Sequence, residues 1–178
     1  MFKKVVSLVV LMALVMSAAA FAAVNSPAWP TGPVAVSASS GTVTALPLTE
    51  AAKAIVDAIK DKTAADIFGD EAKLQAISSG AVPSDIDFAA YKLDRVFSLT
   101  ITDADTTQDL TVDFPVVPAY AADAKLLGAV GIIENGAASW TAVKASVVES
   151  AVESVIPAAT VDAVQNGSGE AVYAILVG

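Results

Sequence analysis

The sequence predicts an α+β domain that is mainly β, namely an antiparallel β-sandwich with a helical insertion, preceded by a signal peptide. Several short segments alternate apolar and polar residues, as half-buried strands do. The run Leu126–Ile133 is wholly apolar, which fits a central strand buried on both faces. Between the predicted strands, residues of about 47–79 change to helical periodicity. The spacing of strands and turns fits two sheets over one core, so we expect residues 34–178 to form one domain.

The N-terminus predicts a secretory signal peptide over residues 1–22. Lys3 and Lys4 provide a basic start, Val5–Met16 is apolar, and Ala20-Phe21-Ala22 offers small residues for cleavage. A retained membrane anchor is the alternative, but the apolar stretch is shorter than the ~20 residues of a spanning helix. We therefore expect a secreted, extracellular or cell-surface protein, with the periplasm as a further location, and no stable membrane span after cleavage.

Residues 23–33 (A-V-N-S-P-A-W-P-T-G-P) predict an extended, proline-rich arm. Two interpretations of Trp29 stay open. The ring could pack on its own domain and fix the terminus. Alternatively, the arm could dock on a neighbouring molecule and add a strand to its open sheet edge, which would build an extracellular filament.

The first half of the domain predicts a hairpin followed by two helices. Val34–Ala38 and Thr42–Leu46 suit the hairpin, because Ser39-Ser40-Gly41 lies between them. Pro47–Lys62 predicts an amphipathic helix capped by Thr49, and a shorter helix follows at about Asp70–Ser78. The apolar stripe of the first helix is Leu48, Ala52, Ile55, Val56 and Ile59.

Two alternating segments follow, Tyr91–Thr102 and Leu110–Val116, and we expect them to form an antiparallel hairpin through Asp103–Asp109. Strict alternation places one set of residues of the first segment on the buried face: Tyr91, Leu93, Arg95, Phe97, Leu99 and Ile101.

The C-terminal third predicts three more strands and one or two helical turns. Ser139–Val148 and Val152–Ile156 suit a pair, and Pro157–Gln165 suits the helical turns. Glu170–Val177 is almost wholly apolar, so we expect it inside a sheet and not at an exposed edge.

From Leu110 to Val177 the order of features resembles the β-sandwich modules of bacterial exported and cell-surface proteins. The resemblance rests on turn and packing motifs. They are Phe114-Pro115, Pro118-Ala119-Tyr120, Leu126–Ile133, Asn135-Gly136, Trp140–Ile156 and Tyr173-Ala174-Ile175. Glu149-Ser150 departs from it, because a glycine turn would be usual there. The resemblance implies a surface or matrix role and names no ligand.

Composition narrows the chemistry. The formal net charge is −9, and loss of Lys3 and Lys4 with the signal peptide makes it more negative by two, which opposes binding to nucleic acid. The chain has no histidine and no cysteine. This excludes Ser-His-Asp triads, Cys-His dyads and imidazole metal sites. Carboxylate, lysine, serine and tyrosine chemistry stays open.

Candidate site residues each have a structural alternative. The turn Asp103–Asp109, with Asp113 nearby, could offer oxygen ligands to calcium, but it lacks the glycine and distal glutamate of an EF-hand and also suits a solvated turn. Trp140 lies on the predicted sheet face opposite Thr141, Val143, Ala145 and Val147. There it could stack on a sugar or a partner, or be covered by the helix.

Other residues carry less signal. Tyr120, Lys144 and Tyr173 suit packing, and Asn166-Gly167-Ser168 is a glycosylation sequon. No pair stands out among nineteen acids. We therefore assign no catalytic residue, no cofactor-binding residue, no cofactor and no metal site.

The function expected is that of an exported, non-catalytic structural or binding module at the cell surface. Its partner would be a protein, a polysaccharide or further copies of itself. Two alternatives remain: a secreted carboxylate-dependent hydrolase, and a filament subunit assembled through the arm.

Overall fold

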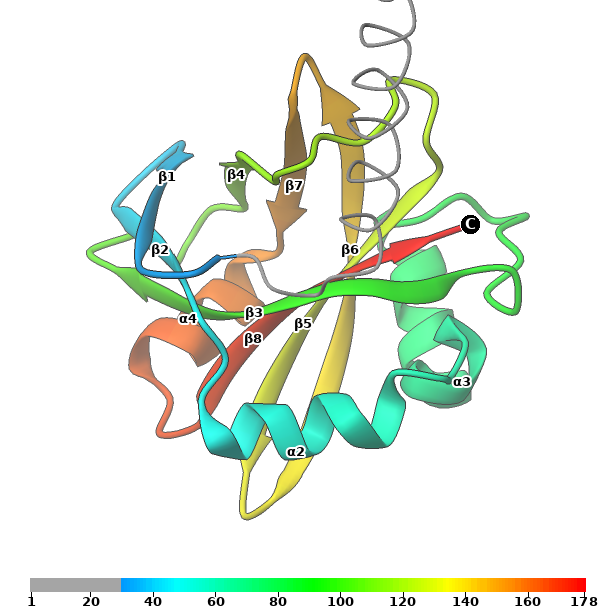
Figure 1. The fold of residues 1–178 in the computed structure, drawn as a ribbon, viewed down its shortest axis with the longest axis horizontal. Helices are drawn as coiled ribbons and strands as arrows, with labels where there is room; N and C mark the ends of the chain where they lie inside the picture. Colours follow the sequence, from blue (N-terminus) through cyan, green and yellow to red (C-terminus); the bar gives the residue numbers. More distant parts are fainter. Residues whose placement is uncertain (1–29) are drawn as a thin grey trace, which may run out of the picture.

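The computed structural model describes residues 30–178, which form a β-barrel with three helices on its outside and at one end (Figure 1). The predicted signal peptide and most of the predicted arm, including Trp29, lie outside the described residues. The strands are β1 (Val34–Ala38), β2 (Thr42–Leu46), β3 (Lys92–Thr102), β4 (Leu110–Phe114), β5 (Leu126–Glu134), β6 (Ala137–Val148), β7 (Ala151–Ile156) and β8 (Glu170–Val177). The helices are α2 (Glu50–Ile59), α3 (Ala64–Ser78) and α4 (Ala158–Asn166).

The predicted sandwich is wrong, because the eight strands form one closed antiparallel barrel in the order β1-β2-β3-β8-β5-β6-β7-β4. Closure depends on a short pairing between β1 and β4, in which Ser37 opposes Asp113 and Ala38 opposes Val112. Without that pairing the same strands would form an open, curled sheet. Alternating patterns are common to sandwiches and barrels, so periodicity alone does not separate them.

The local hairpins are as predicted, and the longer one is not. β1 pairs with β2, and β6 pairs with β7, both antiparallel. The predicted hairpin of Tyr91–Thr102 with Leu110–Val116 is wrong. β3 pairs with β2 and β8, whereas β4 pairs with β1 and β7. The connection after β3 therefore crosses from one side of the barrel wall to another.

The predicted buried face of β3 is correct only for its second half. Phe97, Leu99 and Ile101 point into the barrel. Leu93 packs instead with a second apolar cluster, which lies between the barrel wall and helices α2 and α3 and is called the outer cluster below. Its buried members include Ala52, Phe68, Ala76, Val96, Leu127, Val172 and Leu176. The pairing of β3 with β8 shifts register between Leu93 and Arg95, which indicates a bulge. A bulge inserts one residue and moves the preceding side chains to the opposite face. Tyr91 accordingly packs with the outer cluster as well.

The barrel interior is filled by a cluster of three aromatic rings. The ring centroids of Phe114 and Tyr173 lie 4.5 Å apart, and that of Phe97 lies 5.1 Å from Phe114 and 5.4 Å from Tyr173. The Tyr173 hydroxyl forms a buried hydrogen bond with Ser154 on β7. Gly128 faces this hydroxyl, and a Cβ at that position would lie 2.3 Å from it. The interior thus requires a glycine on β5 to accept the tyrosine.

The central strand and the last strand are confirmed as interior elements of the sheet. β5 lies between β6 and β8, and its residues from Leu126 to Gly131 are buried. β8 lies between β3 and β5 and is buried except for its two end residues, Glu170 and Val177. These two strands, together with β3 and β6, make up the part of the barrel wall that the helices cover.

The outer layer begins with the predicted amphipathic helix. Thr49 caps α2 by accepting a hydrogen bond from the Ala52 amide at 3.2 Å, as expected. The apolar stripe of α2 packs against the outer cluster, with Ala52 and Ile59 buried. Glu170 at the start of β8 accepts hydrogen bonds from Thr49 at 2.7 Å and from Ser98 at 3.1 Å. This carboxylate ties α2 to the barrel.

The next helix, α3, is longer than predicted. It contains the predicted turns of Asp70–Ser78 and a preceding turn, separated by a kink at Gly69, where φ is 68°. It lies over the outer face of β6 (Figure 1). The predicted helical turns of Pro157–Gln165 are confirmed as α4, whose Val161 belongs to the interior cluster and helps to close the barrel end. Among the described residues, no helix is both long and apolar enough to cross a bilayer.

Candidate functional site

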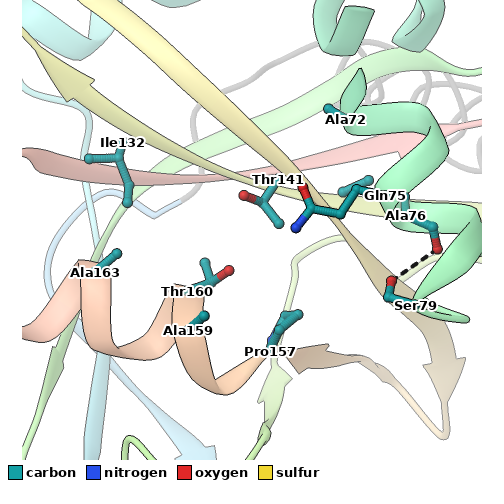
Figure 2. Close-up of a pocket in the computed structure, with 11 residues that line it drawn as sticks. Ala72, Gln75, Ala76, Ser79, Ile132, Thr141, Pro157, Ala159, Thr160 and Ala163 are labelled. Carbon is teal, nitrogen blue, oxygen red and sulfur yellow. Dashed lines mark hydrogen bonds between the residues drawn. The ribbon is translucent and has the colours of Figure 1, made fainter. Parts of the chain in front are cut away.

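A groove of about 290 Å³ lies between α3, α4 and the β5–β6 hairpin (Figure 2). This volume is near the lower end of the range for ligand pockets, about 300–1,000 Å³. No charged side chain lines the groove, and most of its lining residues are small. They are Ala72, Gln75, Ala76 and Ser79 of α3 or its C-terminal cap, Ile132 of β5, Thr141 and Ala142 of β6, and Pro157, Ala159, Thr160 and Ala163 at α4.

The groove follows from the way in which β7 ends. β6 pairs with β5 along residues 137–144, but it pairs with β7 only from Lys144 to Val148. β7 stops at Ile156 because Pro157 has no amide hydrogen for a strand ladder, and the chain turns there into α4. The helix therefore lies across the groove from Thr141 and Ala142 of β6, and residues 137–143 have no second strand beside them.

Three neutral polar side chains extend into the groove from three different elements. Figure 2 shows Gln75 from α3, Thr141 from β6 and Thr160 from α4 around the same space. Thr160 is only 8% exposed. None of these three side chains has a hydrogen-bond partner within residues 30–178. Among those residues, only Arg95 Nε is both sealed from solvent and without a hydrogen-bond partner, so the Thr160 hydroxyl is reachable from the groove.

Thr160 is nearly buried as a residue, but its hydroxyl opens onto the groove, where solvent or a ligand can pair with it. The arrangement can therefore donate and accept hydrogen bonds to an uncharged molecule.

No protein-family model, no curated protein and no solved structure matches this chain.

The acidic turn that suggested calcium is built from hydrogen bonds within the fold. Asp105 Oδ1 accepts from the Thr107 amide at 2.9 Å and its hydroxyl at 2.6 Å, and these bonds lower the pKa of Asp105. Asp109 Oδ1 accepts from the Ala158 amide at 3.0 Å, at the start of α4. Asp113 lies on β4 opposite Glu153. In the described part of the chain, no three acidic side chains gather in a group that could hold a metal ion.

Trp140 lies on the outer face of β6, as the alternation predicted, and is half-buried in the outer cluster. Its ring covers Gly131 on β5, where a Cβ would lie 2.7 Å from the ring. This matches the alternative in which the face is covered. Asn166 of the sequon is exposed at the end of α4, and its amide donates to Asp162 at 2.8 Å.

Tyr120 belongs to a polar cluster away from the groove, together with Asp94 and Arg95 near the start of β3. Its hydroxyl donates to Asp94, and Arg95 lies over its ring with 5.8 Å between the guanidinium carbon and the centroid. Burial, followed by the Asp94 contact, raises the pKa of Tyr120. Arg95, 5% exposed, donates to the Val117 carbonyl at 2.6 Å. This cluster fastens the connection between β4 and β5.

The two remaining predicted residues have structural positions. Tyr173 is fully buried in the barrel, and this burial raises the pKa of its hydroxyl. Lys144 is exposed on β6 and marks the point where the pairing with β7 begins.

The residues that line the groove were missed by the sequence analysis. Thr141 was assigned to the core face of its strand, and neither Gln75 nor Thr160 was singled out. The available signal was Pro157, which ends a strand pattern directly before a helix of small residues.

Proposed function

We propose that this protein is an exported, non-catalytic binding module that holds a polypeptide partner in the groove between α3 and α4. The observation that supports the proposal is Thr160, a nearly buried residue whose hydroxyl has no partner within residues 30–178 and opens onto an uncharged groove. A protein partner is one of the partners expected from the sequence. Export and a cell-surface location are part of the proposal and rest on the N-terminal sequence.

The non-catalytic character is supported by the placement of the ionisable groups. The groove is lined by no acid, lysine or arginine. The buried or half-buried ionisable side chains with clear partners, namely Tyr120, Asp94, Arg95, Tyr173 and Glu170, fasten strands, loops and a helix to one another. They leave no carboxylate directed into the groove for hydrolysis.

The test is nuclear magnetic resonance on the full isotope-labelled chain, titrated with capped neutral peptides and with neutral oligosaccharides. We expect the amide signals of Gln75, Thr141 and Thr160 to shift together and to saturate. Shifts confined to other surfaces, or turnover of any probe, would contradict the proposal.

The second candidate function is the filament subunit assembled through the N-terminal arm. The unpaired edge of β6 at residues 137–143 favours it, because an added strand needs such an edge. Sedimentation of the full chain, compared with a variant lacking residues 23–29, tests it. Monomers in both samples at every concentration would eliminate this candidate.

A further inference from the structure

The free edge of β6 has none of the sequence features that natural proteins use to protect an edge. Such edges carry charged residues, prolines or bulges, which discourage pairing with another chain. Residues 137–143 read A-A-S-W-T-A-V and contain no charge and no proline. They hold their register with β5 without a shift. This edge is therefore regular, its own side chains do not protect it, and α4 lies across the groove from it.

The edge and the groove form one continuous surface. Thr141 and Ala142 belong to both, with α3 on one side of the strand and α4 facing its edge (Figure 2). On an antiparallel strand, every second residue directs its N–H and C=O toward the same edge. The backbone of β6 thus supplies alternating donors and acceptors beside the amide of Gln75 and the two threonine hydroxyls.

We propose that the occupant of the groove is an uncharged, extended polypeptide segment with small side chains, which adds to the edge of β6 as a strand. This inference rests on the proposed function and specifies its ligand. Main-chain hydrogen bonds to β6 provide the affinity, as in other cases of strand addition. The Thr160 hydroxyl and the Gln75 amide pair with polar groups of the segment that β6 does not reach.

The size and charge of the groove select the side chains of the segment. Alanines from α3 and α4 form the walls, and about 290 Å³ leaves no room for several large side chains. No basic or acidic group stands in the lining to neutralise a charge, so burying a charged side chain there would be costly. Alanine, serine, glycine and threonine fit these limits.

A polysaccharide fits the same surface less well. Sugar rings stack on exposed aromatic faces, and no aromatic residue lines the groove. Trp140, the aromatic residue of β6, has its ring over Gly131 instead. The N–H and C=O groups along an unpaired strand edge repeat with the spacing of a peptide backbone, which a chain of sugar rings does not share.

The experiment titrates the full labelled chain with four probes. The first is a capped pentapeptide of alternating alanine and serine. The second has the same side chains with alternate backbone nitrogens methylated, which removes the donors on one edge. The third carries a glutamate and a lysine in place of two serines, and the fourth is a neutral cello-oligosaccharide.

We expect saturable shifts at residues 137–143 and at Thr160 with the first peptide only. Binding should be nearly unchanged between about 0.05 and about 0.5 M salt, because no charge pairs form. Equal binding of the methylated peptide, or preferential binding of the charged one, would overturn strand addition by an uncharged segment.

Two substitutions sharpen the test, each with a matched control. Thr160→Val removes one hydroxyl and should weaken peptide binding about three- to tenfold. Thr111→Val makes the same change on β4, away from the groove, and should leave binding unaltered. Ala159→Leu fills the groove from an exposed position and should abolish binding, whereas Ala54→Leu on the exposed side of α2 should not.

The outcomes separate the ligand from the function. If the oligosaccharide shifts the groove residues and the peptide does not, the groove is a binding site and the polypeptide assignment is wrong. If no probe shifts the groove residues and Ala159→Leu has no effect on any binding, both the ligand and the proposed function are wrong.

Discussion

The hydroxyl groups of two buried residues, Tyr173 and Thr160, illustrate how the barrel interior differs from the groove. Inside the barrel, the Tyr173 hydroxyl pairs with Ser154, and Gly128 leaves the space for it. Thr160 is also nearly buried as a residue, but its hydroxyl opens onto the groove and pairs with nothing in residues 30–178. The first hydroxyl is paired within the fold, whereas the second is left to solvent or to the ligand that we propose. The difference separates a hydroxyl that fastens two strands from one that the fold leaves available.

The largest effect is expected from the aromatic cluster of the interior. Phe114→Ala removes the ring that contacts both Phe97 and Tyr173, so it should lower the free energy of unfolding by about 3–5 kcal/mol. Urea denaturation measures this value. Leu74→Ala is the control, because Leu74 is 67% exposed on α3 and should change stability little. A small effect of Phe114→Ala would show that the interior is loosely packed.

The hydroxyl pair of the interior should behave as a coupled unit. Ser154→Ala leaves the Tyr173 hydroxyl buried without a partner and should cost about 1–3 kcal/mol. Adding Tyr173→Phe removes the unpaired group, so the double variant should recover most of that loss. Additive losses in the double-mutant cycle would contradict a shared hydrogen bond.

Alkaline pH should weaken the fold through two tyrosines. Folding raises the pKa of Tyr173 by burial and that of Tyr120 by burial and by Asp94. Above about pH 10 the unfolded chain loses protons that the folded chain retains, so stability is complete below this pH and falls above it.

Above about pH 10, the loss of Tyr173 protons should lower the free energy of unfolding by up to about 1.4 kcal/mol per pH unit. The contribution of Tyr120 should be smaller, because Tyr120 is partly exposed. Urea denaturation between pH 8 and about pH 11 measures it. Tyr173→Phe in the Ser154→Ala background should flatten the curve. An unchanged slope in that variant would show that Tyr173 ionises as easily in the folded chain as in the unfolded one.

The smallest effect is expected at the groove, and it has the opposite sign. Thr160→Val replaces the unpaired hydroxyl of a nearly buried residue with a methyl group, so the free protein should become more stable by about 0.5–1 kcal/mol. Thermal denaturation should show a rise of about 1–4 °C. Thr111→Val controls for the general effect of a valine. A loss of stability in Thr160→Val would mean that the fold itself uses the hydroxyl, which would remove the contrast with the interior.

Elements that depend on neighbouring residues could be predicted from the sequence. The stripe of α2 and its Thr49 cap, the β1–β2 and β6–β7 hairpins, and the burial of β5 and β8 all follow from local patterns. The barrel could not be predicted, because closure depends on β1 reaching β4, two strands that lie far apart in the chain. The bulge at the start of β3 changes the face of Leu93 while leaving the alternating pattern intact.

The candidate site could not be predicted for a similar reason. Thr141 was expected to face the core because its strand alternates, and it does share a face with Val143. The alternating pattern does not show that β7 pairs only with residues 144–148 of β6, which leaves residues 137–143 without a second neighbouring strand. Gln75 comes from α3, which packs on the outer face of β6, and Thr160 comes from α4, which follows β7 directly. The groove thus depends on the packing of an early helix against a late part of the sheet, which no single segment encodes.

The short closure of the barrel also has a mechanical consequence. β1 holds only two residue pairs with β4 and three with β2, whereas β8 holds eight with β5. Tension applied at Pro30 would therefore peel β1 away first, one pair after another, while the wall of β3, β8, β5 and β6 keeps its shape. Force spectroscopy would record this release as a separate event before global rupture. Because the groove is lined by β5, β6, α3 and α4, and by no residue of β1, its lining should keep its arrangement while β1 is released.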